Sequence, residues 1–198
     1  MVLTICVLHM KRKRDTSFEE LFSTLDSSIH VVVYTPREKN LLEKILQLQP
    51  DGILITGSER RIHRIQQNLL PERLLDLGIP VLGICYGFQW MTWRKGGINH
   101  TFEDKKLHEY EKYLEISAPF HISRRKYVFT HHDFIYELPA SWKKVIDHED
   151  QIWMAYESST GHIGIQFHPE KLPASAHAFF PSWFSWLKIH SHKTKKMI

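Results

Sequence analysis

Two short segments carry the residues best suited to chemistry. Residues 83–87 read Gly-Ile-Cys-Tyr-Gly, and residues 164–170 read Gly-Ile-Gln-Phe-His-Pro-Glu. They supply a nucleophile, Cys85, a base, His168, and a carboxylate, Glu170. A cysteine nucleophile requires a base that holds it as thiolate and a third group that fixes the tautomer of that base. The two segments therefore predict a thiol enzyme.

The residues around Cys85 predict a sharp turn from a strand into a helix. An apolar run at residues 79–82 precedes the turn, and a helix-like stretch at residues 88–93 follows it. Gly83 and Gly87 provide the room that such a turn needs, and the turn raises the nucleophile above the edge of the sheet. A helix that begins at Tyr86 would direct its N-terminal amides toward the sulfur, which favours the thiolate.

His168 and Glu170 follow an apolar run at residues 163–165, which indicates a strand. Residues two apart in an extended segment point the same way, so Glu170 can reach the imidazole from behind. Pro169 lies between them and restricts the backbone. Catalytic groups of a parallel α/β sheet gather beyond the carboxyl ends of its strands, and both Cys85 and His168 follow such ends.

The first half of the chain alternates short apolar runs with amphipathic segments. Strands are expected at residues 2–8, 31–34, 52–55 and 81–84. The segments between them repeat apolar residues at helical spacing: Phe18, Leu21, Phe22 and Leu25, then Leu41, Leu42, Ile45, Leu46 and Leu48, then Ile62, Ile65, Leu69, Leu70, Leu74 and Leu75. Continuous apolar strands separated by helices indicate a parallel sheet that is buried on both faces.

The second half predicts shorter strands, some of them antiparallel, at residues 113–117, 126–130, 143–147, 152–157 and 162–167. A closing helix from about Ala174 to Ile189 carries an aromatic stripe that is typical of core packing. No internal repeat or low-complexity linker interrupts the chain. We therefore expect residues 1–198 to form a single α/β domain with a disordered tail at about residues 190–198.

Composition excludes several other classes of protein. The chain has 198 residues, a formal net charge of +4, 42% hydrophobic residues and two cysteines. Two cysteines exclude a disulfide scaffold and favour a reducing, cytoplasmic location. The basic runs at residues 11–14 and 193–196 favour a solvated loop and tail over a nuclear-localisation or nucleic-acid patch, because no aromatic residues interleave with them. Residues 2–8 are too short to span a bilayer, so no membrane association is expected.

The two segments around Cys85 and His168 together resemble the class I, triad-type glutamine amidotransferases, and most of all the glutaminase portion of GMP synthetases. Supporting stretches include Gly52 to Ser58, Gly96-Gly97-Ile98, Thr130 to Asp133, and Leu138-Pro139. The resemblance covers about residues 50–170. It implies a flavodoxin-like, doubly wound and mostly parallel sheet with helices on both faces and a short antiparallel extension.

The resemblance also implies a reaction and a set of site residues. Cys85 would attack the side-chain amide of glutamine, and His168 with Glu170 would complete the triad of a thioester mechanism. The family pattern further assigns an oxyanion hole and substrate contacts. The residues at these positions are Tyr86, Ser58 and Gly57 for the oxyanion hole and Gln89, His131 and Asp133 for the substrate. No cofactor is implied, and no Cys/His cluster has the spacing of a metal site.

The sequence departs from the family pattern at the oxyanion loop, where Ser58 and Glu59 replace a glycine and a proline. No ATP-pyrophosphatase sequence follows residue 198, so we expect a separate synthetase subunit to receive the ammonia, or else a lone hydrolase. Two alternatives remain open: a γ-glutamyl hydrolase or peptidase with the same triad, and a non-catalytic regulatory relative.

Overall fold

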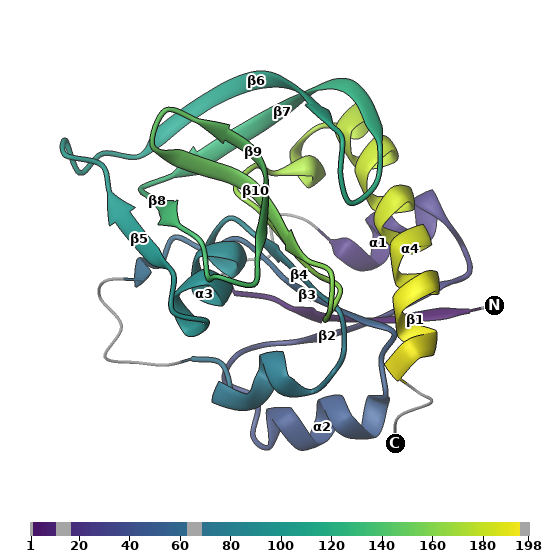
Figure 1. Cartoon of the computed structure of the whole chain (residues 1–198). Helices are drawn as coiled ribbons and strands as arrows, with labels where there is room; N and C mark the ends of the chain where they lie inside the picture. The colour runs from purple at the N-terminus through teal and green to yellow at the C-terminus, as the bar shows by residue number, and fades with distance from the viewer. Residues whose placement is uncertain (1, 11–16, 63–68, 195–198) are drawn as a thin grey trace.

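The computed structural model describes residues 2–10, 17–62 and 69–194. The first half alternates strands and helices (Figure 1). Its elements are β1 (Leu3–Leu8), α1 (Phe18–Leu25), β2 (Ile29–Tyr34), α2 (Leu41–Leu48), β3 (Gly52–Ile55), the 3-10 helix η2 (Glu72–Asp76), β4 (Val81–Ile84) and α3 (Tyr86–Arg94).

The second half is mostly strands and ends in a long helix. Its elements are β5 (Ile98–Thr101), β6 (His108–Ile116), β7 (Ile122–His131), β8 (Asp133–Glu137), β9 (Lys143–His148), β10 (Gln151–Glu157), β11 (His162–Ile165), the 3-10 helix η3 (Pro169–Lys171) and α4 (Pro173–Thr194). Among the described residues, no helix is long and apolar enough to cross a membrane.

The central sheet of the described residues has the order β2-β1-β3-β4-β11-β10-β8-β5, with β9 added on β10. The first five strands in this order pair in parallel, whereas β10, β8, β5 and β9 pair antiparallel. In chain order the parallel strands run 2-1-3-4-5, which is the flavodoxin-like arrangement. The strands β6 and β7 form a separate antiparallel ribbon, which lies along the upper side of Figure 1. The expected α/β fold is confirmed.

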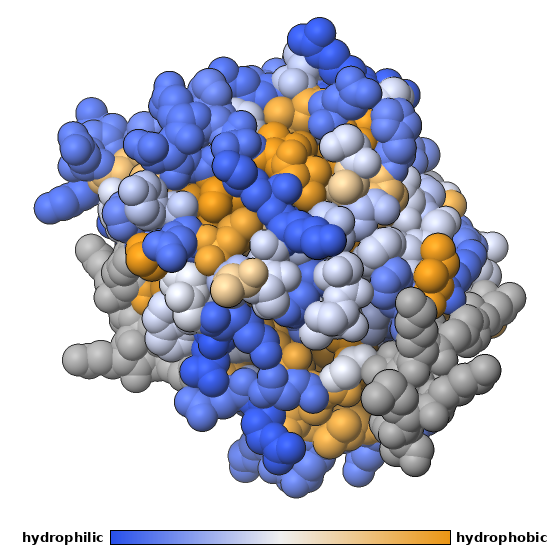
Figure 2. Space-filling model, in the orientation of Figure 1, coloured by the Kyte–Doolittle hydropathy of each residue, from blue (hydrophilic) through white to orange (hydrophobic). Residues whose placement is uncertain are grey.

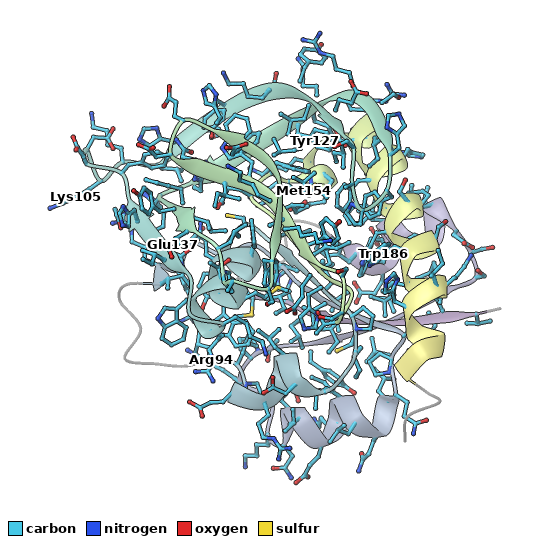
Figure 3. All side chains as sticks on the ribbon, in the orientation of Figure 1. Arg94, Lys105, Tyr127, Glu137, Met154 and Trp186 are labelled. Carbon is cyan, nitrogen blue, oxygen red and sulfur yellow. The ribbon has the colours of Figure 1, made fainter. Side chains whose placement is uncertain are left out.

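Two hydrophobic clusters cover the two faces of the parallel strands. Alternate residues of β1, such as Ile5 and Cys6, belong to different clusters, as the period of a strand requires. One cluster joins the sheet to α1 and α4, and the other joins it to α2, η2 and α3. The aromatic stripe of α4 lies in the first cluster, so its interpretation as core packing is confirmed. Trp186 lies on α4, as its label in Figure 3 shows, and donates its indole N–H to the Gly161 carbonyl at 3.1 Å.

The outer surface is more polar than these faces. Figure 2 shows mainly hydrophilic side chains, with separate apolar patches between them. The basic run at residues 11–14 lies outside the described residues, as do Lys195 and Lys196. Helix α4 continues to Thr194, so residues 190–194 of the expected tail are helical, and residues 195–198 lie outside the described residues.

Three expectations about secondary structure need correction. The helix expected from Ile62 to Leu75 is wrong in its described part, because Leu69 and Leu70 are not helical and only η2 follows them. Pro71 explains the break, since the residue before a proline is disfavoured in helical conformation. Ile65 lies outside the described residues. The strands β5 and β8 were not expected, and β6 and β7 begin earlier than predicted, at His108 and Ile122.

A buried histidine joins the first half of the fold to the second. His162 at the start of β11 accepts a hydrogen bond from the Val81 amide at 3.2 Å, and its other ring nitrogen donates to the Leu75 carbonyl at 3.2 Å. This pattern requires the neutral imidazole. Burial accordingly lowers the pKa of His162 to about 4.

The protonation of His162 should therefore make the fold sensitive to acid. As the pH falls from about 6.5 toward 4, the unfolded chain binds a proton that the folded chain excludes, so the free energy of unfolding decreases. Chemical denaturation at a series of pH values measures this slope. His162→Gln should reduce the slope, and His177→Gln on the exposed side of α4 should leave it unchanged. An equal slope in wild type and His162→Gln would contradict the prediction.

Candidate functional site

Parallel pairing of β4 with β11 places the two predicted segments side by side. Gly83 lies opposite Gly164, and Ile84 lies opposite Ile165, so both strands end at the same edge of the sheet. The amide of Cys85 then donates a hydrogen bond of 2.7 Å to the Ile165 carbonyl. This bond continues the ladder beyond the last strand pair. It fixes the backbone of Cys85 relative to the segment that carries His168.

Cys85 adopts a backbone conformation that residues other than glycine rarely adopt. Its φ and ψ are 51° and −103°, and α3 begins at the next residue. Such a conformation costs about 1–3 kcal/mol and persists only when the surroundings enforce it. A Cβ on Gly87 would lie 2.3 Å from the Ile55 carbonyl oxygen, and a Cβ on Gly83 would lie 2.6 Å from the Met91 sulfur. The expectation that these two glycines provide room for the turn is confirmed.

His168 and Glu170 form a buried pair beside Cys85. The Nδ1 atom of His168 and the Oε1 atom of Glu170 are 2.7 Å apart, and the two side chains are 4% and 8% exposed. Burial by itself lowers the pKa of His168, but the Glu170 carboxylate and the Cys85 sulfur outweigh it and raise the pKa to about 10. The imidazolium form is therefore favoured near neutral pH.

The second ring nitrogen of His168 is available for proton transfer. Its Nε2 atom is buried and has no hydrogen bond within standard limits to any described residue. The Cys85 sulfur lies close enough to raise the pKa of the ring. The same sulfur is 3.5 Å from the carbonyl oxygen of Thr130 at the end of β7. An imidazolium beside a thiol stabilises the thiolate, which is the nucleophilic form.

The loop after β3 completes the surroundings of this pair. A Cβ built on Gly57 would lie 2.7 Å from Cε1 of His168 and 3.6 Å from Cβ of Cys85, so only glycine leaves room for the imidazole there. The hydroxyl of Thr56 donates to the Gly57 carbonyl at 3.1 Å and accepts from the Met10 amide at 3.0 Å. The hydroxyl of Ser58 bonds to the Met10 carbonyl at 3.3 Å. These bonds tie the loop to the segment after β1.

A cavity of about 350 Å³ opens over these groups. Its walls come from the loops after β3 and β4, the end of β7, the start of β8 and η3. The lining residues are Ser58, Glu59, Arg60, Cys85, Gln89, Leu107, Thr130, His131, His132, Asp133, His168 and Lys171. Two further predicted residues lie beside this lining. Gly57 lies against Cys85 and His168, and Tyr86 follows Cys85 as the first residue of α3. Glu170 lies behind His168, away from the cavity lining.

The three residues expected to contact substrate line one wall and are bonded to one another. The side-chain amide of Gln89 donates to the Asp133 carbonyl at 2.6 Å and to the Gln166 side-chain oxygen at 3.2 Å. The Nδ1 atom of His131 donates to the same Asp133 carbonyl at 3.0 Å, and its Nε2 accepts from the Tyr110 hydroxyl at 3.1 Å. Burial lowers the pKa of His131 to about 4. The ring is thus neutral, and both of its nitrogens have partners within the protein.

The sequence alone assigned no role to two of the lining residues, Thr130 and Lys171. Thr130 directs its carbonyl toward the Cys85 sulfur and its hydroxyl toward the Lys171 ammonium, which lies at 2.7 Å. No local pattern identifies Lys171, because its partner is 41 positions away. Among the described residues, no group of three or more metal-ligating side chains gathers.

Comparison with known proteins agrees with the family resemblance of the sequence. A family model described as "Glutamine amidotransferase class-I" matches residues 16–185. Two similar curated proteins are named "GMP synthase [glutamine-hydrolyzing]", from Streptococcus pneumoniae strains JJA and CGSP14. Each is 27% identical over 161 residues, an alignment that covers 78% of this chain and 31% of the relative. The chain thus matches about a third of the length of these relatives.

A solved structure shares the fold. It is the crystal structure of a putative GMP synthase subunit from Thermoplasma acidophilum, and it superposes with a TM-score of 0.69 over 98% of both chains. Its sequence identity to this chain is 16%, so the likeness concerns the fold alone.

The pairing of Cys85 with His168 should be visible in thiol reactivity. At pH 7 we expect iodoacetamide to alkylate Cys85 readily and to leave Cys6 unmodified in the native protein, because burial raises the pKa of Cys6 to about 12. His168→Ala should slow alkylation of Cys85 at least tenfold, since the cation that favours thiolate is lost. Mass spectrometry of timed samples gives both rates, and His177→Ala serves as control. An unchanged rate in His168→Ala would exclude the proposed interaction.

Proposed function

Because the chain belongs to the class-I glutamine amidotransferase family, we propose that it hydrolyses the side-chain amide of glutamine through a thioester on Cys85. The observation that carries the proposal is the meeting of Cys85, His168 and Glu170 beside one cavity. These are the nucleophile, the base and the orienting group that acyl transfer to sulfur requires.

In the first half of the reaction, the Cys85 thiolate attacks the amide carbon of glutamine. The carbon–sulfur bond forms, and the carbonyl electrons move onto oxygen to give a tetrahedral oxyanion. When the oxyanion collapses, the carbon–nitrogen bond breaks, and the His168 imidazolium gives its proton to the departing ammonia. The raised pKa of His168 supports this order of events, because the ring begins as the acid.

In the second half, the γ-glutamyl thioester is hydrolysed. His168 is now neutral and takes a proton from water, which attacks the thioester carbon. A second oxyanion collapses, the sulfur leaves as thiolate, and glutamate is released with His168 protonated again. Glu170 holds the ring through Nδ1 in both halves, so that Nε2 faces the reacting atoms.

The oxyanion requires backbone donors, for which we propose the amides of Ser58 and Tyr86. Tyr86 is the first residue of α3, where an amide has no carbonyl partner within the helix. The Gly57 carbonyl is held by the Thr56 hydroxyl, on the side tied to Met10. Carbonyl and amide of one trans peptide point in opposite directions, which supports a Ser58 amide directed away from Met10 and toward the cavity.

We further propose that Gln89, Asp133 and the backbone near His131 contact the glutamine, since they form the wall beside Cys85. We also propose that a separate ATP-pyrophosphatase or synthetase subunit receives the ammonia; the name GMP synthase of the relatives supports an acceptor of this kind. No cofactor is needed for the hydrolysis itself.

The central prediction concerns Cys85. Wild type should release ammonia from L-glutamine, alone or with a synthetase partner, and Cys85→Ala should lose at least 1,000-fold in rate because no thioester can form. Coupled measurement of ammonia and glutamate tests this, with Cys6→Ala as the matched control. Full activity in Cys85→Ala would refute the mechanism. Faster cleavage of γ-glutamyl peptides than of glutamine would instead identify a γ-glutamyl hydrolase.

A pair of variants at Ser58 tests the oxyanion hole. Both Ser58→Ala and Ser58→Pro remove the hydroxyl, but Ser58→Ala keeps the backbone N–H, whereas Ser58→Pro replaces it with a ring carbon and also fixes φ. We expect Ser58→Pro to reduce kcat about 100- to 1,000-fold and Ser58→Ala to reduce it far less. Thermal melting verifies that both variants fold. Equal kcat values for the two variants would show that this amide stabilises no oxyanion.

A further inference from the structure

Lys171 lies at the mouth of the cavity because of the same turn that positions Glu170. The 3-10 helix η3 contains both residues, and the Lys171 amide bonds back to the His168 carbonyl at 3.4 Å. Glu170 thereby turns inward against the imidazole, whereas Lys171 is exposed and lines the cavity. Its position relative to the reacting groups is therefore set by the backbone of the triad segment itself.

The ammonium of Lys171 is held in place by a neutral partner. Its partner is the neutral Thr130 hydroxyl at 2.7 Å, and in the described part of the chain no carboxylate pairs with it. Three other charged residues line the cavity: Glu59 and Arg60, which are adjacent and of opposite sign, and the buried Asp133, whose carboxylate accepts a hydrogen bond from the Thr101 hydroxyl at 2.7 Å. A lysine ammonium has three donors, so two remain available to an anion after the bond to Thr130.

Thr130 connects this ammonium to the nucleophile. Its carbonyl oxygen is 3.5 Å from the Cys85 sulfur, and its hydroxyl holds the Lys171 nitrogen. The Val128 carbonyl accepts the His168 amide at 2.8 Å, which fixes the end of β7 against the segment that carries Lys171. Thr130 thus contacts both the sulfur and the ammonium, so these two groups lie near each other. A substrate bound to the sulfur therefore needs only a short carbon chain to bring a second group to the ammonium.

We propose that Lys171 binds the α-carboxylate of the substrate and thereby selects γ-glutamyl compounds whose α-carboxylate is free. This inference rests on the proposed function, because it names the binding partner of the α-carboxylate in the same glutamine molecule whose amide reacts at Cys85. In glutamine, three carbon atoms separate the reacting amide carbon from the carboxylate carbon, a span suited to bridging Cys85 and Lys171. A charge-assisted bond between ammonium and carboxylate contributes more than a neutral hydrogen bond at this position.

The test compares L-glutamine with L-glutamine α-amide, which lacks the carboxylate but keeps the reacting amide. For Lys171→Met we expect KM for L-glutamine to rise about tenfold, with kcat within about twofold of wild type. KM for the α-amide should stay unchanged. Lys171→Arg should restore most of the affinity, and Thr130→Val should raise KM for L-glutamine less than Lys171→Met does. Lys112→Met, an exposed lysine on β6 outside the cavity, is the matched control.

Equal changes in KM for both substrates, or no change for either, would overturn the assignment of Lys171 while leaving the glutaminase proposal intact. A second measurement separates the two proposals. Labelling of Cys85 by a glutamine analogue with an electrophilic diazoketone in place of the amide requires binding but no ammonia release. If the wild type releases no ammonia from glutamine but labelling is slower in Lys171→Met than in the wild type, the carboxylate site is supported and the glutaminase is refuted. Labelling at the same rate in Lys171→Met and wild type would refute the carboxylate site.

Discussion

The close parallel contact between β4 and β11 is the constraint on which the rest of the site depends. Gly83 and Gly164 face each other across this contact, and α3 packs directly over them. A Cβ on Gly164 would lie 1.8 Å from the ring of Phe88, which is fully buried. Side chains at these two positions would lift the helix off the sheet. The turn at Cys85 would then lose its fixed place beside His168.

The buried histidine–carboxylate pair is the main electrostatic feature that this packing encloses. Burying charged groups is costly unless they are paired and hydrogen-bonded. Glu170 supplies the pairing through one oxygen, while its Oε2 atom and the Nε2 atom of His168 have no partner among the described residues. Together with the strained backbone of Cys85, this represents free energy that the surrounding core must offset. Such features concentrate where a protein performs chemistry.

The opposite wall of the cavity follows a different principle, because the hydrogen bonds that hold it join neutral groups. His131, Gln89 and the Asp133 carbonyl satisfy one another, and the Tyr110 hydroxyl completes the set. A wall held by internal hydrogen bonds keeps its shape without placing a second cation near the imidazolium. His168 and His131, which both line the cavity, are therefore held in opposite states: His168 is favoured as the cation and His131 as the neutral ring.

Local patterns in the sequence determined the strands and helices of the first half, the aromatic core face of α4 and the two glycines of the turn, since each depends on neighbouring residues alone. The same patterns were wrong at residues 69–75, where Pro71 interrupts the helical spacing. They also missed β5 and β8, two short strands that pair with each other, β8 pairing in addition with β10. Residue type and spacing, supported by the family resemblance, predicted Cys85, His168 and Glu170 as partners. Only the tertiary structure decided that Thr130 and Lys171 join them, because these contacts, 41 to 45 positions apart, form where the end of β7 packs against the segments that follow β4 and β11, and they leave no periodic trace in the chain.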